Sequence, residues 1–174
     1  VQQFEDALYS KTGYNSLGKH YSEYLDIESL AKTYLLSCFT GQNDFLDCSD
    51  YLNLEPTYES GKITGGKLMG GPAWDYDVSI YATDGLYADK ISTNVNGNQA
   101  WISQAGDFTD ALYKLKIGAF ADAVASMTDK VQTYGENVAA SLVMDQLMWN
   151  RTTSAQQKYD TQTADFLKRA NTTW

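Results

Sequence analysis

The stretch Asp26–Thr40 (DIESLAKTYLLSCFT) decides the fold, because it has the pattern of a single buried helix. Its apolar residues recur every three or four positions, which is the spacing of one helical stripe. Asp26 stands just before the stripe, where a carboxylate accepts hydrogen bonds from the free N–H groups of a first helical turn. Gly41 follows it, where a glycine commonly ends a helix. The members of the stripe are Ile27, Leu30, Ala31, Tyr34, Leu35 and Cys38.

The next segment has the pattern of a β-hairpin. Tyr51–Leu54 (YLNL) alternates as a strand does, and Lys62–Met69 (KITGGKLM) reads as the returning strand, with a turn over Pro56–Gly61 between them. Its paired glycines lack the spacing of a phosphate-binding loop, and no helix follows them. We therefore predict a hairpin across Tyr51–Met69.

The C-terminal half returns to helical spacing. Asp84–Gln99 is polar and rich in Gly and Asn, which predicts a long loop, and helical periodicity begins at Asp107. We expect four helices from there to the end of the chain, which makes an α+β, mainly helical fold. Four of their apolar residues are predicted to be buried against the Ile27–Cys38 helix or its neighbours: Phe120, Val124, Leu142 and Leu147.

Composition narrows the class of protein. Thirteen Lys and Arg residues against 22 Asp and Glu residues give a formal net charge of −9 at pH 7, which disfavours a nucleic-acid binder. No run of about 18 apolar residues is present, so we expect no membrane span. With one histidine, His20, and no CxxC motif, a zinc site has too few ligands, and we interpret His20 as a solvated loop residue. Cys38 and Cys48 are interpreted as two buried free thiols, although a disulfide between them is the alternative.

Two acids in Trp74–Asp77 (WDYD) are the first candidates for chemistry. In an extended segment Asp75 and Asp77 point to the same side, where two carboxylates repel each other unless a cation neutralises them. Oxygen ligands of this kind suit a hard cation such as Mg²⁺. The alternatives are two exposed turn residues, two partners for Lys or Arg, or a Ca²⁺ site that only stabilises structure. Trp74 is interpreted as a core residue that directs this loop.

Asp44 is the second candidate, in the acidic loop Asn43–Ser49 directly after the predicted buried helix. A negative charge there opposes the helix dipole and needs a reason to persist. Phosphoryl transfer by kinases uses a carboxylate to orient the acceptor hydroxyl. Ser49 lies five residues later, the spacing at which protein kinases carry an Asn that holds a second metal ion. The five-residue spacing is the same as in protein kinases, but this chain has Ser49 where they have Asn.

The order of these motifs resembles the CotH kinase family, an atypical protein-kinase-like fold that is named for a spore-coat protein and occurs in many secreted bacterial proteins. The segments that carry the resemblance cover about the whole chain. They are EYLDIESLAKTYLL (Glu23–Leu36), the Asn43-Asp44 loop, SDYL (Ser49–Leu52), GKL (Gly66–Leu68), GPAWDYD (Gly71–Asp77), ALYK (Ala111–Lys114) and MWNR (Met148–Arg151).

The resemblance implies a kinase-like C-terminal lobe that uses ATP and Mg²⁺ to phosphorylate Ser or Thr of extracytoplasmic proteins, in a secreted or cell-surface bacterial protein. Asp44 would be the catalytic aspartate and Asp75 the metal ligand, with Asp77 as its neighbour and Ser49 as a second metal or supporting residue. Gln42 departs from the family, which has Asn at this position.

A larger departure is that the family's nucleotide-anchoring Lys lies upstream of the region that this chain matches. We therefore expect residues 1–174 to be the C-terminal portion of one domain, completed by an upstream part of the same polypeptide and inactive without it. The alternative is a non-catalytic structural or binding module of a large secreted or cell-surface protein.

Overall fold

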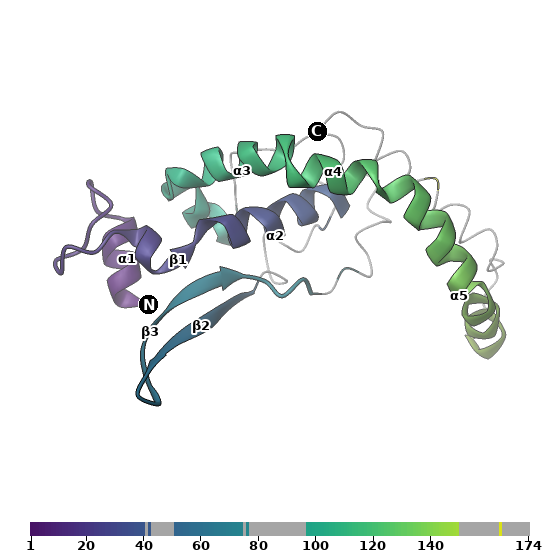
Figure 1. Cartoon of the computed structure of the whole chain (residues 1–174), viewed down its shortest axis with the longest axis horizontal. Helices are drawn as coiled ribbons and strands as arrows, with labels where there is room; N and C mark the ends of the chain where they lie inside the picture. Colours follow the sequence, from purple (N-terminus) through teal and green to yellow (C-terminus); the bar gives the residue numbers. More distant parts are fainter. Residues whose placement is uncertain (41, 43–50, 75, 77–96, 150–163, 165–174) are drawn as a thin grey trace.

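The computed structural model describes residues 1–40, 42, 51–74, 76, 97–149 and 164 of the 174-residue chain. The described part is α+β and mainly helical, with a small sheet on one side of helix α2 and helix α3 on another (Figure 1). The elements are α1 (Gln2–Leu8), η1 (Tyr21–Glu23), β1 (Leu25–Asp26), α2 (Ile27–Thr40), β2 (Leu52–Glu59), β3 (Lys62–Gly70), η4 (Gly97–Gln104), α3 (Asp107–Ile117), α4 (Ala119–Ala125) and α5 (Met127–Trp149).

Helix α2 confirms the prediction for Asp26–Thr40. The Asp26 carboxylate accepts a hydrogen bond from the backbone N–H of Ser29 at 2.8 Å, as a capping residue does. The predicted stripe is buried from Leu30 to Cys38, and Ile27 packs partly buried against the same core. Tyr34 meets Phe108 of α3 edge to face, with ring centroids 5.4 Å apart. Burial of each large apolar side chain stabilises the fold by about 1.5–3 kcal/mol, so this face of α2 anchors the core.

The hairpin is also confirmed, as part of a three-stranded sheet with the order β1-β3-β2. β1 pairs with β3 in parallel, and β2 pairs with β3 in antiparallel register from Leu52↔Gly70 to Glu59↔Lys62. The predicted turn over Pro56–Gly61 is wrong. The turn is only Ser60 and Gly61, with φ of 49° and 76°, as a two-residue hairpin turn requires.

β2 accommodates Pro56 because the proline nitrogen points away from the partner strand. The Gly71 N–H donates to the Tyr51 carbonyl at 2.9 Å. In antiparallel pairing alternate residues point their N–H and C=O groups at the partner strand, so Asn53 and Glu55 do so as well as Tyr51. At Pro56 the nitrogen faces away from β3, on the edge of the sheet, where its missing N–H breaks no pairing.

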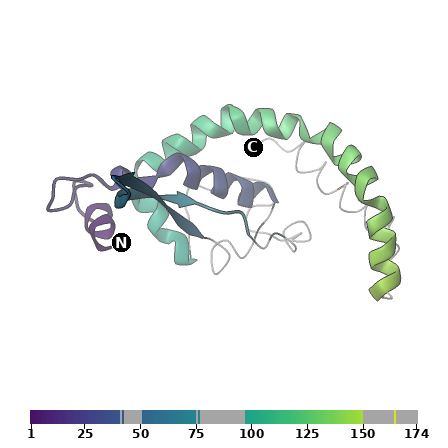
Figure 2. The same cartoon turned by 60° about the horizontal axis from the view of Figure 1, so that its bottom comes forward.

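The C-terminal half differs from the prediction in two places. Figures 1 and 2 show α3, α4 and α5 following one another in an arch, with α5 leading away from α2. From apolar spacing, the second of the four expected helices runs from Phe120 to Val131 and the third from Val138 to Trp149, whereas the structure ends α4 at Ala125 and joins the rest in the 23-residue helix α5. The predicted loop ends earlier than expected, because Gly97–Gln104 forms the 3₁₀ helix η4, in which Ile102 is fully buried. The helix predicted around Phe166 lies outside the described residues.

The expected burial of the late apolar residues is only partly right. Phe120 packs against the core and meets Phe39 edge to face, with ring centroids 5.9 Å apart. Val124 and Leu142 are half-buried, and Leu147 is 71% exposed. Leu147 belongs to α5, and this helix leads away from α2 (Figure 2). Its side chain is exposed because α2 does not lie against this part of α5. Among the described helices, none combines the length and the apolar character that a bilayer span requires.

Candidate functional site

Two segments flank the predicted catalytic and metal-binding residues: the C-terminal end of α2 and the segment that follows β3. The predicted residues themselves lie outside the described part of the chain: Asp44, Ser49, Asp75 and Asp77. Their described neighbours are Gln42, which stands two positions before Asp44, and Trp74 and Tyr76, which stand on either side of Asp75. These neighbours show how the two segments lie relative to each other.

The segment after β3 starts in close contact with the first turns of α2. A Cβ atom on Gly70 would lie 2.7 Å from the Leu30 Cα, so only glycine allows this approach. The Gly70 N–H also donates to the Ser29 hydroxyl at 2.9 Å. Ser37 lies two helical turns after Leu30, about 10 Å further along the axis. The chain covers this length between Gly70 and Tyr76, so the segment follows α2 toward its C-terminal end.

Ser37 and Tyr76 form the tighter of two links between the segments. Their hydroxyl oxygens lie 2.8 Å apart, in hydrogen-bond contact. Ser37 is fully buried and Tyr76 is half-buried. A buried hydroxyl without a partner destabilises a protein by about 1–3 kcal/mol, so this contact favours one position of Tyr76. Tyr76 is the residue between Asp75 and Asp77, and its side chain is therefore held against α2.

Gln42 forms the second link. Its side chain is fully buried, and its backbone N–H donates to the Ser37 carbonyl at 2.9 Å, which ends α2. Its Nε2 donates to the Trp74 carbonyl at 3.4 Å, which is long for a hydrogen bond. In the sequence, Gln42 stands out only as a departure from the family pattern. In the structure Gln42, which precedes Asn43 and Asp44, contacts Trp74, which precedes Asp75.

Trp74 is placed differently from the prediction. It is 57% exposed and not a core residue, so the interpretation as core packing is wrong. Its ring meets that of Tyr51 edge to face, with centroids 6.1 Å apart, and Tyr51 is itself 46% exposed. The pair keeps Trp74 next to the start of β2. Two exposed aromatic rings therefore lie beside the segment that carries the predicted acids.

Other reactive side chains have structural roles. Cys38 is a free, fully buried thiol, and burial raises its pKa to about 12, so it stays protonated at neutral pH. Its predicted free state is confirmed, while Cys48 lies outside the described residues.

His20 is half-buried and caps η1 through its Nδ1, with its ring close to Tyr14 and Tyr21. In the described part of the chain, no three His, Cys, Asp or Glu residues gather as a metal site.

Sequence reasoning missed the Ser37–Tyr76 pair, although one signal was present. Ser37 falls on the apolar stripe of α2, three positions after Tyr34 and seven after Leu30. A polar residue on a buried face needs a hydrogen-bond partner. That requirement predicts a partner but does not say which of the distant hydroxyls supplies it.

Comparison of the chain with protein-family models, curated proteins and solved structures gave no match. The resemblance to the CotH kinase family therefore rests on the motifs of the sequence.

Proposed function

We propose that this chain is the C-terminal portion of a CotH-type kinase-like domain, which transfers a phosphoryl group from ATP to Ser or Thr of an extracytoplasmic protein. Asp44 would accept a hydrogen bond from the acceptor hydroxyl, and Asp75 and Asp77 would bind Mg²⁺. The metal would supply positive charge to the transferring phosphate. We further propose that the domain is completed by an upstream part of the same polypeptide and belongs to a secreted or cell-surface protein.

One observation carries the proposal: the flanks of the predicted acids meet at the end of α2. The Gln42–Trp74 and Ser37–Tyr76 contacts join two stretches that are distant in sequence. Phosphoryl transfer depends on carboxylates from the acceptor side and from the metal side acting at one centre. Contacts between the flanking residues are what such a centre requires. Two unrelated surface loops would not be expected to share two partly buried hydrogen bonds.

The chemistry of the donors agrees with magnesium. Carboxylate oxygens are the ligands that Mg²⁺ prefers, and a chain with a net charge of −9 needs a cation to hold a nucleotide near several acids. The same carboxylates would also accept Ca²⁺, which keeps a purely structural site as the competing interpretation. Nucleotide dependence separates the two.

A non-catalytic binding module is the second candidate, and a specific observation favours it. Large apolar side chains are exposed on the hairpin and along α5, among them Leu54, Tyr58, Ile63, Leu147 and Trp149. Exposed apolar residues in such numbers are typical of surfaces that contact further protein. The same surfaces would meet the rest of a kinase-like domain if the first proposal holds.

The test is phosphorylation by the full-length protein, with labelled ATP and Mg²⁺. We expect Asp44→Ala and Asp75→Ala each to lower the rate by at least about a hundredfold, because each removes a charged group from the reacting centre. Asp110→Ala is the matched control, since Asp110 is an exposed acid on α3. Full activity of both variants would overturn the roles assigned to these acids. Absence of activity in the full-length protein would favour the binding module.

A further inference from the structure

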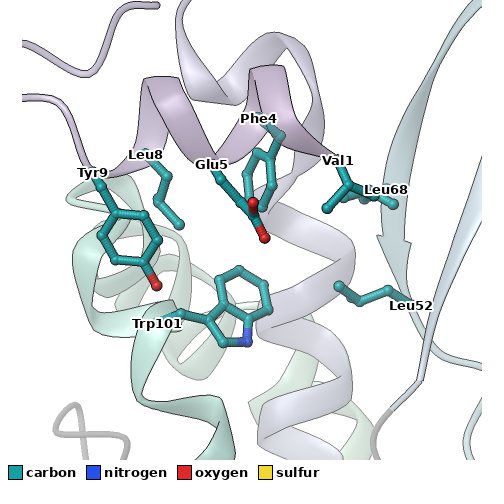
Figure 3. Close-up of a pocket in the computed structure, with 8 residues that line it drawn as sticks. All are labelled: Val1, Phe4, Glu5, Leu8, Tyr9, Leu52, Leu68 and Trp101. Carbon is teal, nitrogen blue, oxygen red and sulfur yellow. The ribbon is translucent and has the colours of Figure 1, made fainter.

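A hollow lies outside the candidate site, where α1, η4 and the hairpin meet (Figure 3). Its volume is about 460 Å³, within the range of small-molecule sites. The walls are mainly apolar, with Phe4 and Leu8 from α1, Leu52 and Leu68 from the hairpin and Trp101 from η4. We call it the α1 pocket.

Part of the wall of the α1 pocket belongs to the core of the protein, while Val1, Tyr9 and Leu52 are exposed. Phe4 and Leu8 are buried members of the main hydrophobic cluster, and Trp101 packs against it. The Phe4 and Trp101 rings meet edge to face, with an interplanar angle of 89° and centroids 6.0 Å apart. Side chains held in this way keep their positions without a ligand, so this part of the wall is preformed.

One charged group lines this apolar hollow. Figure 3 shows the Glu5 carboxylate turned toward Trp101, between the walls that α1 and η4 supply. Within the described residues, neither a cation nor a side-chain donor pairs with this carboxylate; the ion pair seen there joins Lys32 to Glu28. Its neighbour Asp6 differs, because it accepts a hydrogen bond from Gln2 at 3.0 Å. Glu5 thus presents an exposed carboxylate to the α1 pocket, with no cation or side-chain donor beside it in the described part of the chain.

We propose that the α1 pocket binds a small organic cation: a protonated amine carried on an apolar or aromatic body. The Glu5 carboxylate would accept a charge-assisted hydrogen bond from the ammonium group. The indole of Trp101 favours a nearby cation through its electron-rich ring, and the apolar walls cover the body of the ligand. A nucleotide is disfavoured there, because Glu5 repels its phosphates.

The α1 pocket is close to the candidate site along the chain. Leu52 forms part of its wall, and the preceding residue, Tyr51, contacts Trp74. The proposal does not depend on kinase activity, since it rests on residues of α1, η4 and the hairpin alone. Binding can therefore be measured whether or not the protein phosphorylates anything.

The experiment is a titration of the full-length protein by calorimetry with three probes of similar shape: phenethylamine, phenethyl alcohol and phenylacetate. We expect the amine to bind at least about tenfold more tightly than the alcohol, and the anion to bind weakest, because an ionic hydrogen bond is worth about 1.4 kcal/mol or more. Glu5→Gln should remove this preference, and it preserves the fold because Glu5 is exposed. Asp6→Asn makes the same change of charge one residue away and should keep the preference.

Four results would overturn the proposal. The first is equal binding of the amine and the alcohol to the unaltered protein, and the second is no binding of any probe. The third is a Glu5→Gln variant that still prefers the amine. A basic peptide that binds where the free amine does not would also refute it, because the ligand would then be a protein segment. Loss of phosphorylation in Asp44→Ala with unchanged amine binding separates this proposal from the proposed function.

Discussion

The hydrogen bond between Ser37 and Tyr76 can be tested without any assumption about activity. Tyr76→Phe removes one hydroxyl and leaves that of Ser37 fully buried without its 2.8 Å partner. An unsatisfied buried hydroxyl costs about 1–3 kcal/mol, and a helical serine can recover part of this by bonding to a carbonyl of the preceding turn. We expect Tyr76→Phe to lower the free energy of unfolding by about 1–2 kcal/mol.

Ser37→Ala should cost less, for two reasons. The Tyr76 hydroxyl that it leaves behind is half-buried and can reach water. Alanine also favours the helix over serine by about 0.5 kcal/mol. In the double variant both hydroxyls are gone, so its loss should fall short of the sum of the single losses by about 1 kcal/mol.

The assay is urea unfolding of the four proteins of this cycle, with the same denaturant dependence required of all four. Tyr113→Phe is the control, because Tyr113 is an exposed tyrosine on α3 and should lose less than about 0.5 kcal/mol. Single losses that add within about 0.3 kcal/mol would refute the reasoning, since independent residues behave in this way. The link between α2 and the segment around Asp75 would then carry no energy.

Two further predictions concern packing. Gly70→Ala should destabilise the protein by about 1–3 kcal/mol in thermal unfolding, because its Cβ would lie 2.7 Å from the Leu30 backbone. Gly65→Ala is the control, because its Cβ would meet open space in the same strand. This control should cost less than about 1 kcal/mol. Equal effects of the two substitutions would contradict the close approach. Cys38 should resist alkylation in the folded protein and react fully after denaturation, as peptide mapping would show. Because its folded pKa is raised from 9.0 to about 12, its contribution to stability should be complete below pH 9 and decline as the pH rises from 9 toward 12. Rapid alkylation of the native protein at pH 8 would show that Cys38 is not buried.

Local pattern determined the elements that lie near one another in sequence. The stripe and the capping Asp26 specify α2 almost to the residue, because helical spacing and a first-turn carboxylate act within a few positions. Alternation likewise located the hairpin across Tyr51–Met69. Proline and glycine at the two ends of Pro56–Gly61 predict a turn there, and only the register of the hairpin shows that Pro56 lies in β2 with its nitrogen facing the edge. Sequence alone does not specify on which side of a strand the backbone is paired.

The tertiary structure decided everything that depends on direction and distance. Val138 and Leu142 have the four-residue spacing of one helix face, but Val138 is exposed on α5, which leads away from α2, because periodicity defines a face and not what lies against it. Ser37 meets Tyr76 across 39 positions of sequence, and four elements supply the walls of the α1 pocket. Such contacts form when separate elements pack, so the residues that create them carry no shared local pattern.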